Sequence, residues 1–222
     1  MVKIAMLLMG VFVATGSCAA ENAMAIGLIG DSTVATTYGW GPEFVPHVKE
    51  DVAVLNVAVN GATLESLSET LDQLLENKPD YVFVQFGHND MKKYDPEVYA
   101  EKLSDYVNRI KNAGGKPVVF SSVTRRRFDE QGTLTPWVID GRTLADYAAA
   151  AEIVAEERNV PFISLYSISV AHHQQIGRDA SMAYNFEGDD TTHFSPEGAK
   201  AIALLIVDEL KRTLPEVAAL LK

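Results

Sequence analysis

Five short apolar runs recur along the chain, and their composition is typical of buried β-strands. Polar residues do not alternate with apolar ones within these runs. A strand that is covered by helices on both faces has this pattern, whereas a half-exposed strand alternates. We therefore predict strands at residues 25–29, 52–59, 81–86, 117–123 and 161–165.

Helical patterns, in which apolar residues recur every three or four positions, lie between and after the predicted strands. The most clearly marked of them begins at Pro196, because Ser195 can cap the helix and proline suits its first turn. Alternating strands and helices indicate an α/β fold, with a parallel sheet of five strands between two helical layers. We predict helices at residues 64–75, 96–113, 144–158 and 196–210.

The first residues of the chain differ from the rest. Lys3 precedes an apolar run at residues 4–13, and small residues follow up to residue 20. This order is typical of a secretory signal, and the run is too short to span a bilayer comfortably. We expect a signal at residues 1–20 and a single domain at residues 21–222, in a protein that is secreted or periplasmic. The alternative is a lipoprotein signal, which would anchor the protein to the cell surface through Cys18.

Charge and cysteine content exclude several classes of function. The formal net charge of −11 argues against binding to nucleic acid or to an anionic membrane. Cys18 is the only cysteine and lies in the predicted signal, so the domain has no disulfide and no thiol nucleophile. His172 and His173 are poor joint metal ligands, because adjacent side chains diverge. We expect a monomer that needs no metal and no organic cofactor.

Polar residues that can carry chemistry follow the predicted strands. Ser32 follows the first strand, Gly61 the second and Asn89 the third, whereas Asp190 and His193 come well after the fifth. The carboxyl ends of parallel strands share one edge of a sheet, and ligands bind there. A serine hydroxyl becomes a nucleophile when a histidine takes its proton and a carboxylate orients that histidine. The pattern therefore indicates a serine hydrolase.

Four blocks, in this order along the chain, resemble those of the SGNH (GDSL-type) hydrolases, and among these the rhamnogalacturonan acetylesterase-like branch. The resemblance extends over residues 25–213 and implies a flavodoxin-like arrangement of the five strands. The blocks are Gly30-Asp31-Ser32-Thr33, Gly61 at the end of segment 56–61, Gly87-His88-Asn89-Asp90, and Asp190-Thr191-Thr192-His193.

The resemblance implies a role for each block. Ser32 would be the nucleophile, His193 the general base and then the general acid, and Asp190 the carboxylate that orients it. The oxyanion hole would use the backbone N–H groups of Ser32 and Gly61 and the side-chain amide of Asn89. These residue types suit that task, since glycine allows a tight turn and an amide donates without a charge that must be desolvated.

Each block taken alone has a simpler interpretation. The turn at Ser32 could be a helix cap, Asn60-Gly61 an ordinary turn, and the pair Asp190 and His193 a surface pair or two metal ligands. Their joint order at the strand ends favours catalysis.

Other motifs match less well. The block at Ser32 lacks the last glycine of the α/β-hydrolase nucleophile elbow, and segment 39–41 lacks the third glycine of a dinucleotide-binding fingerprint.

The predicted connection at residues 124–140 is long, and long loops are often functional. It carries Arg125, Arg126 and Arg127 on an otherwise acidic chain. Arginine binds carboxylates in a bidentate manner, so we expect these residues to contact an anionic substrate such as a uronic-acid polymer. The alternative is that they pair with nearby acids, which are Asp129, Glu130 and Asp140.

Aromatic residues can stack on sugar rings. Trp40, Tyr184 and Phe186 are candidates for such contacts, and His88 is a candidate for the wall of the site. Packing in the core or in loops is the alternative for each of them.

We therefore expect a secreted carbohydrate esterase that hydrolyses acetyl esters on a plant cell-wall polysaccharide, and we favour the rhamnogalacturonan of pectin. The reaction would pass through an acetyl-serine at Ser32. Two alternatives remain open. One is a lipolytic esterase, lysophospholipase or thioesterase on the same fold, which would need an apolar groove for a long acyl chain. The other is a catalytically silent glycan-binding protein on the same scaffold.

Overall fold

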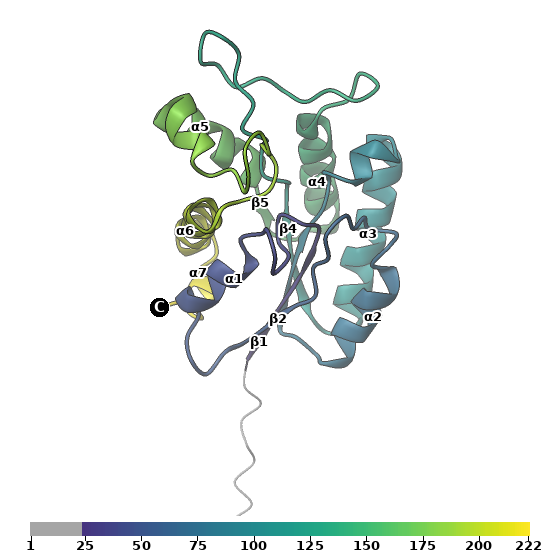
Figure 1. Cartoon of the computed structure of the whole chain (residues 1–222). Helices are drawn as coiled ribbons and strands as arrows, with labels where there is room; N and C mark the ends of the chain where they lie inside the picture. The colour runs from purple at the N-terminus through teal and green to yellow at the C-terminus, as the bar shows by residue number, and fades with distance from the viewer. Residues whose placement is uncertain (1–23) are drawn as a thin grey trace, which may run out of the picture.

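Five parallel strands form the central sheet in the order β2-β1-β3-β4-β5 (Figure 1). This is the flavodoxin-like strand order, so the predicted fold class is confirmed. The computed structural model describes residues 24–222, and the predicted signal segment with Cys18 lies outside the described residues. The strands are β1 (Ala25–Gly30), β2 (Ala53–Asn56), β3 (Tyr81–Gln85), β4 (Lys116–Phe120) and β5 (Phe162–Ile163).

Helices cover both faces of the sheet (Figure 1). One layer contains α2 (Ser68–Glu76), α3 (Pro96–Asn112) and α4 (Leu144–Arg158). The other contains α1 (Gly41–Phe44), α5 (Leu165–Met182), α6 (Pro196–Thr213) and α7 (Pro215–Ala218). None of the helices within residues 24–222 is both long and apolar enough to cross a membrane.

The sheet separates two buried apolar clusters. Along β3, Phe83 packs in the cluster that contains the apolar side of α6, whereas Val82 and Val84 pack in the cluster that contains α3 and α4. Successive side chains of a strand point to opposite faces, so a strand with a core on each side must be apolar throughout. Every residue of β3 is accordingly buried.

The predicted helix starts at Pro96, Leu144 and Pro196 are confirmed. Local signals explain this agreement. Ser195 Oγ accepts a hydrogen bond from the N–H of Gly198, and Thr143 forms a reciprocal capping box with Asp146 at the start of α4.

Several predicted bounds differ from the structure: the helix predicted at residues 64–75 begins at Ser68, and the strands predicted at 117–123 and 161–165 end at Phe120 and Ile163. The strand predicted at residues 52–59 ends at Asn56, although the N–H groups of Val57 and Val59 still bond to the carbonyls of Leu28 and Gly30 on β1. The sequence also did not predict α5. This helix contains a non-helical residue, Gly177, with φ 80° and ψ 174°, and a polar run that hides its apolar face.

Candidate active site

A continuous hydrogen-bonded relay links Ser32, His193 and Asp190. His193 Nε2 lies 2.9 Å from Ser32 Oγ, and His193 Nδ1 lies 2.7 Å from Asp190 Oδ2. Ser32 follows β1, whereas the other two residues lie in the connection between α5 and α6. When Nδ1–H donates to the carboxylate, Nε2 presents its lone pair to the serine hydroxyl. The structure thus brings together the three residues that the sequence proposed as a triad.

Asp190 is fixed by its own turn. Its Oδ1 accepts the backbone N–H groups of Thr192 and His193, both at 3.0 Å. Partial burial raises the pKa of Asp190, but these hydrogen bonds and the imidazole outweigh it and hold the pKa below its usual value. The carboxylate is therefore ionised at neutral pH and sets the tautomer of His193.

Asp31 braces the turn that carries Ser32. Its Oδ1 accepts the backbone N–H of Thr33 at 2.9 Å and the Thr33 hydroxyl at 2.7 Å. Gln85 on β3 donates to the same hydroxyl at 2.5 Å, which ties the turn to the sheet. Gly30 allows this close approach, since a Cβ there would lie 2.5 Å from the carbonyl oxygen of Gln85.

Three N–H donors of the kind that an oxyanion hole needs are available near Ser32. In the described part of the chain, the backbone N–H groups of Ser32 and Gly61 donate to no protein acceptor. Gly61 has a φ of 77°, a conformation that glycine adopts at little cost. Asn89 Nδ2 donates one hydrogen to the carbonyl of Ala62 at 3.1 Å, and Lys92 donates to Asn89 Oδ1 at 2.9 Å. This orientation leaves the second amide hydrogen of Asn89 free for a substrate.

The side chain of Arg126, a candidate for substrate contact from the sequence, bonds to the loop that holds Asp190 and His193. It is fully buried. Its Nη2 donates to the carbonyls of Asp190 and His193 at 3.1 Å and 2.6 Å, and its Nε donates to Asn185 at 2.8 Å. One arginine thus fixes both ends of the segment that holds the proposed acid and base.

Trp40 and His88, two further candidates from the sequence, are both buried and form hydrogen bonds within the protein. Trp40 is 0% exposed, stacks on Phe120 and donates to Gln85 Oε1 at 2.8 Å. His88 Nε2 lies 3.0 Å from the carbonyl of Val123. Burial lowers the pKa of His88 well below its usual value, so the ring is neutral and Nε2 carries the donated hydrogen.

Of the remaining aromatic candidates from the sequence, Phe186 lies on the side of His193, whereas Tyr184 packs elsewhere. Tyr184 stacks on His172, and its hydroxyl lies 3.3 Å from His172 Nε2, so it packs against α5. Phe186 is 39% exposed and contacts Tyr38 edge-on at 4.6 Å between ring centres. The Tyr38 ring centre lies 5.0 Å from that of His193. Sequence analysis missed Tyr38, because no motif distinguishes it from a packing residue.

Arg125 and Arg127 have different environments. Arg127 is exposed, and its side chain forms no ion pair within residues 24–222. Arg125 is partly buried, and its guanidinium carbon lies 3.6 Å from the centre of the Trp137 ring. Of the three arginines in the run, Arg125 is the one that is both held in place and open to a ligand.

Asp90 is a buried acid behind the site. Its Oδ1 accepts the N–H of Leu64 at 3.0 Å, and its Oδ2 has no partner among the described residues. Burial, reinforced by the charge of Asp31, raises the pKa of Asp90 to about 7. The raised pKa means that the folded state holds this proton after the unfolded chain has released it. The stabilising effect is therefore complete below about pH 4 and is lost as the pH rises to about 7.

We expect Asp90→Asn to remove this part of the pH dependence. Relative to the variant, the free energy of unfolding of the wild type should fall by about 3 kcal/mol between about pH 4 and about pH 7. Urea denaturation of the wild type and the variant at several pH values measures this free energy. Asp51→Asn, at an exposed position, is the control and should follow the wild type. Parallel curves for Asp90→Asn and the wild type would contradict the assignment.

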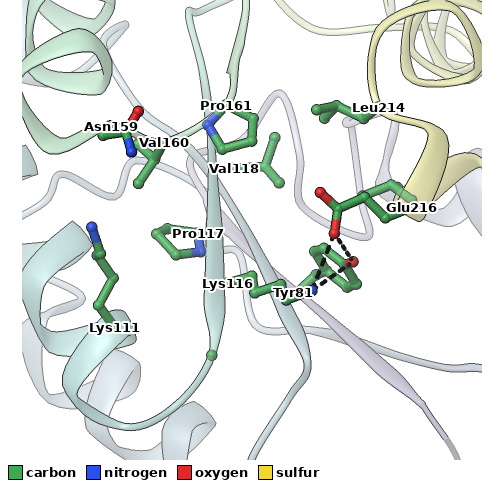
Figure 2. A pocket seen from close by; sticks show the side chains of 12 residues that line it. Tyr81, Lys111, Lys116, Pro117, Val118, Asn159, Val160, Pro161, Leu214 and Glu216 are labelled. Atoms are coloured by element: carbon green, nitrogen blue, oxygen red, sulfur yellow. Dashed lines mark hydrogen bonds and ion pairs between the residues drawn. The ribbon is translucent and has the colours of Figure 1, made fainter.

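A separate pocket lies at the opposite end of the sheet (Figure 2). Tyr81 and Lys116, the first residues of β3 and β4, line it together with Glu216 from α7. Glu216 accepts hydrogen bonds from both, at 3.3 Å and 3.1 Å (Figure 2). The proposed triad follows the carboxyl ends of the strands, so this pocket is not part of its site.

Within residues 24–222, no group of three or more histidine, cysteine, aspartate or glutamate side chains is arranged to hold a metal ion. His173 is buried beside Ser181, with 3.1 Å between Nδ1 and Oγ. Its neighbour His172 contacts Tyr184 instead. The side chains of the two adjacent histidines therefore pack around α5.

Known proteins resemble this chain over most of its length. The model of the GDSL-like Lipase/Acylhydrolase family matches residues 28–201. Rhamnogalacturonan acetylesterase RhgT of Bacillus subtilis is 32% identical over 210 residues, which cover 83% of this chain and 88% of that protein. The probable rhamnogalacturonan acetylesterase YesY of the same species is 31% identical over 216 residues, which cover 88% of this chain and 96% of that protein.

A solved structure is similar over the same region. The crystal structure of YxiM from Bacillus subtilis superimposes with a TM-score of 0.73 at 25% identity. The match covers 85% of this chain and 56% of that one, so this chain spans little more than half of its length. Given the family match and the relatives of similar length, the chain belongs to the GDSL-like lipase/acylhydrolase family and is a serine esterase.

Proposed function

We propose that this esterase removes acetyl groups from rhamnogalacturonan, the pectin backbone of alternating galacturonate and rhamnose. The relay from Asp190 through His193 to Ser32 carries the proposal, because acyl transfer to serine requires it. The similarity to a rhamnogalacturonan acetylesterase over most of both chains supports the choice of substrate. We place the reaction outside the cell, on the basis of the signal predicted at residues 1–20.

In the first half of the reaction, Ser32 Oγ attacks the carbonyl carbon of the acetyl ester while its proton passes to His193 Nε2. The carbonyl oxygen becomes an oxyanion, which accepts hydrogen bonds from the N–H groups of Ser32, Gly61 and Asn89. When the intermediate collapses, the bond to the sugar oxygen breaks. That oxygen takes the proton from His193, which leaves an acetyl group on Ser32.

In the second half, a water molecule replaces the sugar. His193 Nε2 accepts a proton from the water as its oxygen attacks the acetyl carbon. The bond to Ser32 Oγ then breaks, and the proton returns from His193 to that oxygen. Acetate leaves, and the ionised Asp190 stabilises the imidazolium in both halves without accepting its proton.

An aromatic surface beside His193 suits a sugar as the leaving group. Tyr38 is half-buried against His193, and Phe186 extends this surface into solvent. The apolar face of a sugar ring stacks on such side chains. A small hollow of about 170 Å³, lined in part by these two rings, lies next to them.

The proposal is tested by measuring acetate release from acetylated rhamnogalacturonan, acetylated xylan and p-nitrophenyl esters of increasing chain length. We expect the highest kcat/KM on acetylated rhamnogalacturonan and a decline in rate beyond acetate among the aryl esters. Preference for p-nitrophenyl octanoate over the acetate would favour a lipolytic enzyme instead. Absence of labelling of Ser32 by a fluorophosphonate would favour a non-catalytic glycan-binding protein.

Arg126 offers a further prediction. Arg126→Met should lower kcat by about 100-fold, because the loop that holds Asp190 and His193 loses its main-chain anchors and a misplacement of about 1 Å has that effect. Steady-state kinetics with p-nitrophenyl acetate measure it. Arg178→Met, an exposed arginine on α5, is the matched control and should retain wild-type kcat. A normal kcat for Arg126→Met would show that the loop is held by other contacts.

A further inference from the structure

Arg125 is a partly buried cation without an acidic partner in the described part of the chain. None of the acids that the sequence offered as partners forms an ion pair with Arg125 among the described residues, and two of them are engaged elsewhere. Asp140 pairs with Arg142 at 3.2 Å, and Asp129 Oδ1 accepts the backbone N–H groups of Gln131 and Thr133 in its own turn. Arg125 therefore retains its charge for a ligand.

The protein holds this guanidinium in place without neutralising it. One face of Arg125 stacks on Trp137, at 3.6 Å from guanidinium carbon to ring centre. Stacking of this kind leaves the edge of the guanidinium, with its N–H groups, available for a planar anion. Its Nε is buried without a protein acceptor. Burial lowers the pKa of Arg125 to about 10, which still leaves it charged at neutral pH.

Lys92 adds a second positive charge on the side of the site where Asn89 lies. It follows β3 in a short 3-10 turn, and its Nζ donates to Asn89 Oδ1 at 2.9 Å. The same Nζ lies 5.8 Å from the centre of the Trp137 ring. Partial burial and the charge of Arg125 lower the pKa of Lys92, as expected for two neighbouring cations. Two neighbouring cations that form no ion pair among the described residues, on a chain of net charge −11, indicate a place for an anion.

We propose that Arg125, together with Lys92, binds the carboxylate of a uronate residue next to the acetylated sugar. A guanidinium with a free edge matches a carboxylate in a bidentate pair, which the neutral sugars of xylan cannot form. Lys92 also orients the amide of Asn89, so the anion is held beside the group that stabilises the oxyanion. The choice of a uronate polymer rests on the proposed function, whereas the anion site rests on the two cations.

The test measures inhibition of p-nitrophenyl acetate hydrolysis by trigalacturonate, with its methyl ester as the uncharged control. We expect the wild type to bind the acid at least about 10-fold more tightly than the ester at low salt, as a charge-assisted bidentate pair would give. Arg125→Gln should abolish this preference. Arg125→Lys, which keeps the charge but not the fork of N–H groups, should retain part of it. Arg178→Gln, which removes one exposed positive charge elsewhere, should keep all of it.

The proposal is overturned if the wild type does not prefer the acid, or if Arg125→Gln keeps the preference. The readout uses an aryl ester, so it does not depend on the polysaccharide being the substrate. If the wild type releases no acetate from acetylated rhamnogalacturonan but shows the Arg125-dependent preference, the proposed substrate is wrong and the carboxylate site stands. If the wild type releases acetate from acetylated rhamnogalacturonan but does not prefer the acid, the carboxylate site is wrong and the proposed substrate stands.

Discussion

Replacing Ser32 with alanine is expected to lower kcat for p-nitrophenyl acetate by about 10⁴-fold or more. The variant retains the proposed oxyanion donors but cannot form an acetyl-enzyme, because the Oγ that lies 2.9 Å from His193 Nε2 is gone. Steady-state and burst kinetics measure the loss. The fold should be preserved, since the substitution removes one atom from a buried turn that Asp31 and Thr33 hold in place.

The control for this prediction is Ser104→Ala on α3, which should retain wild-type kcat. Labelling by a fluorophosphonate gives a second readout. The wild type and Ser104→Ala should be labelled, and Ser32→Ala should not. Residual labelling of Ser32→Ala, or turnover within about 10-fold of the wild type, would show that another residue is the nucleophile, since a triad serine contributes far more than that.

Replacing Asn89 with alanine is expected to lower kcat by about 10²- to 10³-fold with little change in KM. The amide has one hydrogen bonded to the carbonyl of Ala62 and its oxygen bonded to Lys92, so its second hydrogen is presented in a fixed orientation. A donor of this kind gains most when the carbonyl oxygen acquires negative charge, so its loss raises the barrier more than it weakens substrate binding.

Steady-state kinetics of Asn89→Ala on p-nitrophenyl acetate provide the measurement. Asn77→Ala is the matched control, because Asn77 also donates from Nδ2 to a backbone carbonyl but lies at the end of α2. A kcat for Asn89→Ala equal to that of the control would remove Asn89 from the proposed oxyanion hole. A loss that appeared wholly in KM would assign it to substrate binding.

The fold was predictable because its signals are local. A strand covered on both faces carries apolar side chains on both, as residues 81–84 of β3 do, and helix starts such as Ser195-Pro196 depend on neighbouring residues only. The sequence did not predict α5, because Gly177 interrupts this helix and polar residues obscure its hydrophobic periodicity. It also placed the end of β2 too late, since Asn56, opposite Leu28 of β1, is the last residue of that strand.

Part of the candidate site was predictable for a related reason. In a parallel sheet, residues that follow strands gather at one edge, so the order of Ser32, Gly61 and Asn89 along the chain indicated a common site. What each arginine of the run 125–127 does was not predictable, because adjacent side chains of an irregular loop point in different directions. Arg126 points inward to the carbonyls of Asp190 and His193, whereas its neighbour Arg125 lies on Trp137.

The sequence by itself thus determined the fold class, the identity of the proposed catalytic groups and the acidic character of the chain, since these follow from residue type and local order. Only the tertiary structure decided which side chains are accessible. The sequence does not show which of the aromatic residues Trp40 and Phe186 is buried. In the structure, Trp40 is buried in the core and Phe186 is exposed beside Tyr38. The physical reason is that burial depends on contacts between segments far apart in the chain, which local patterns do not specify.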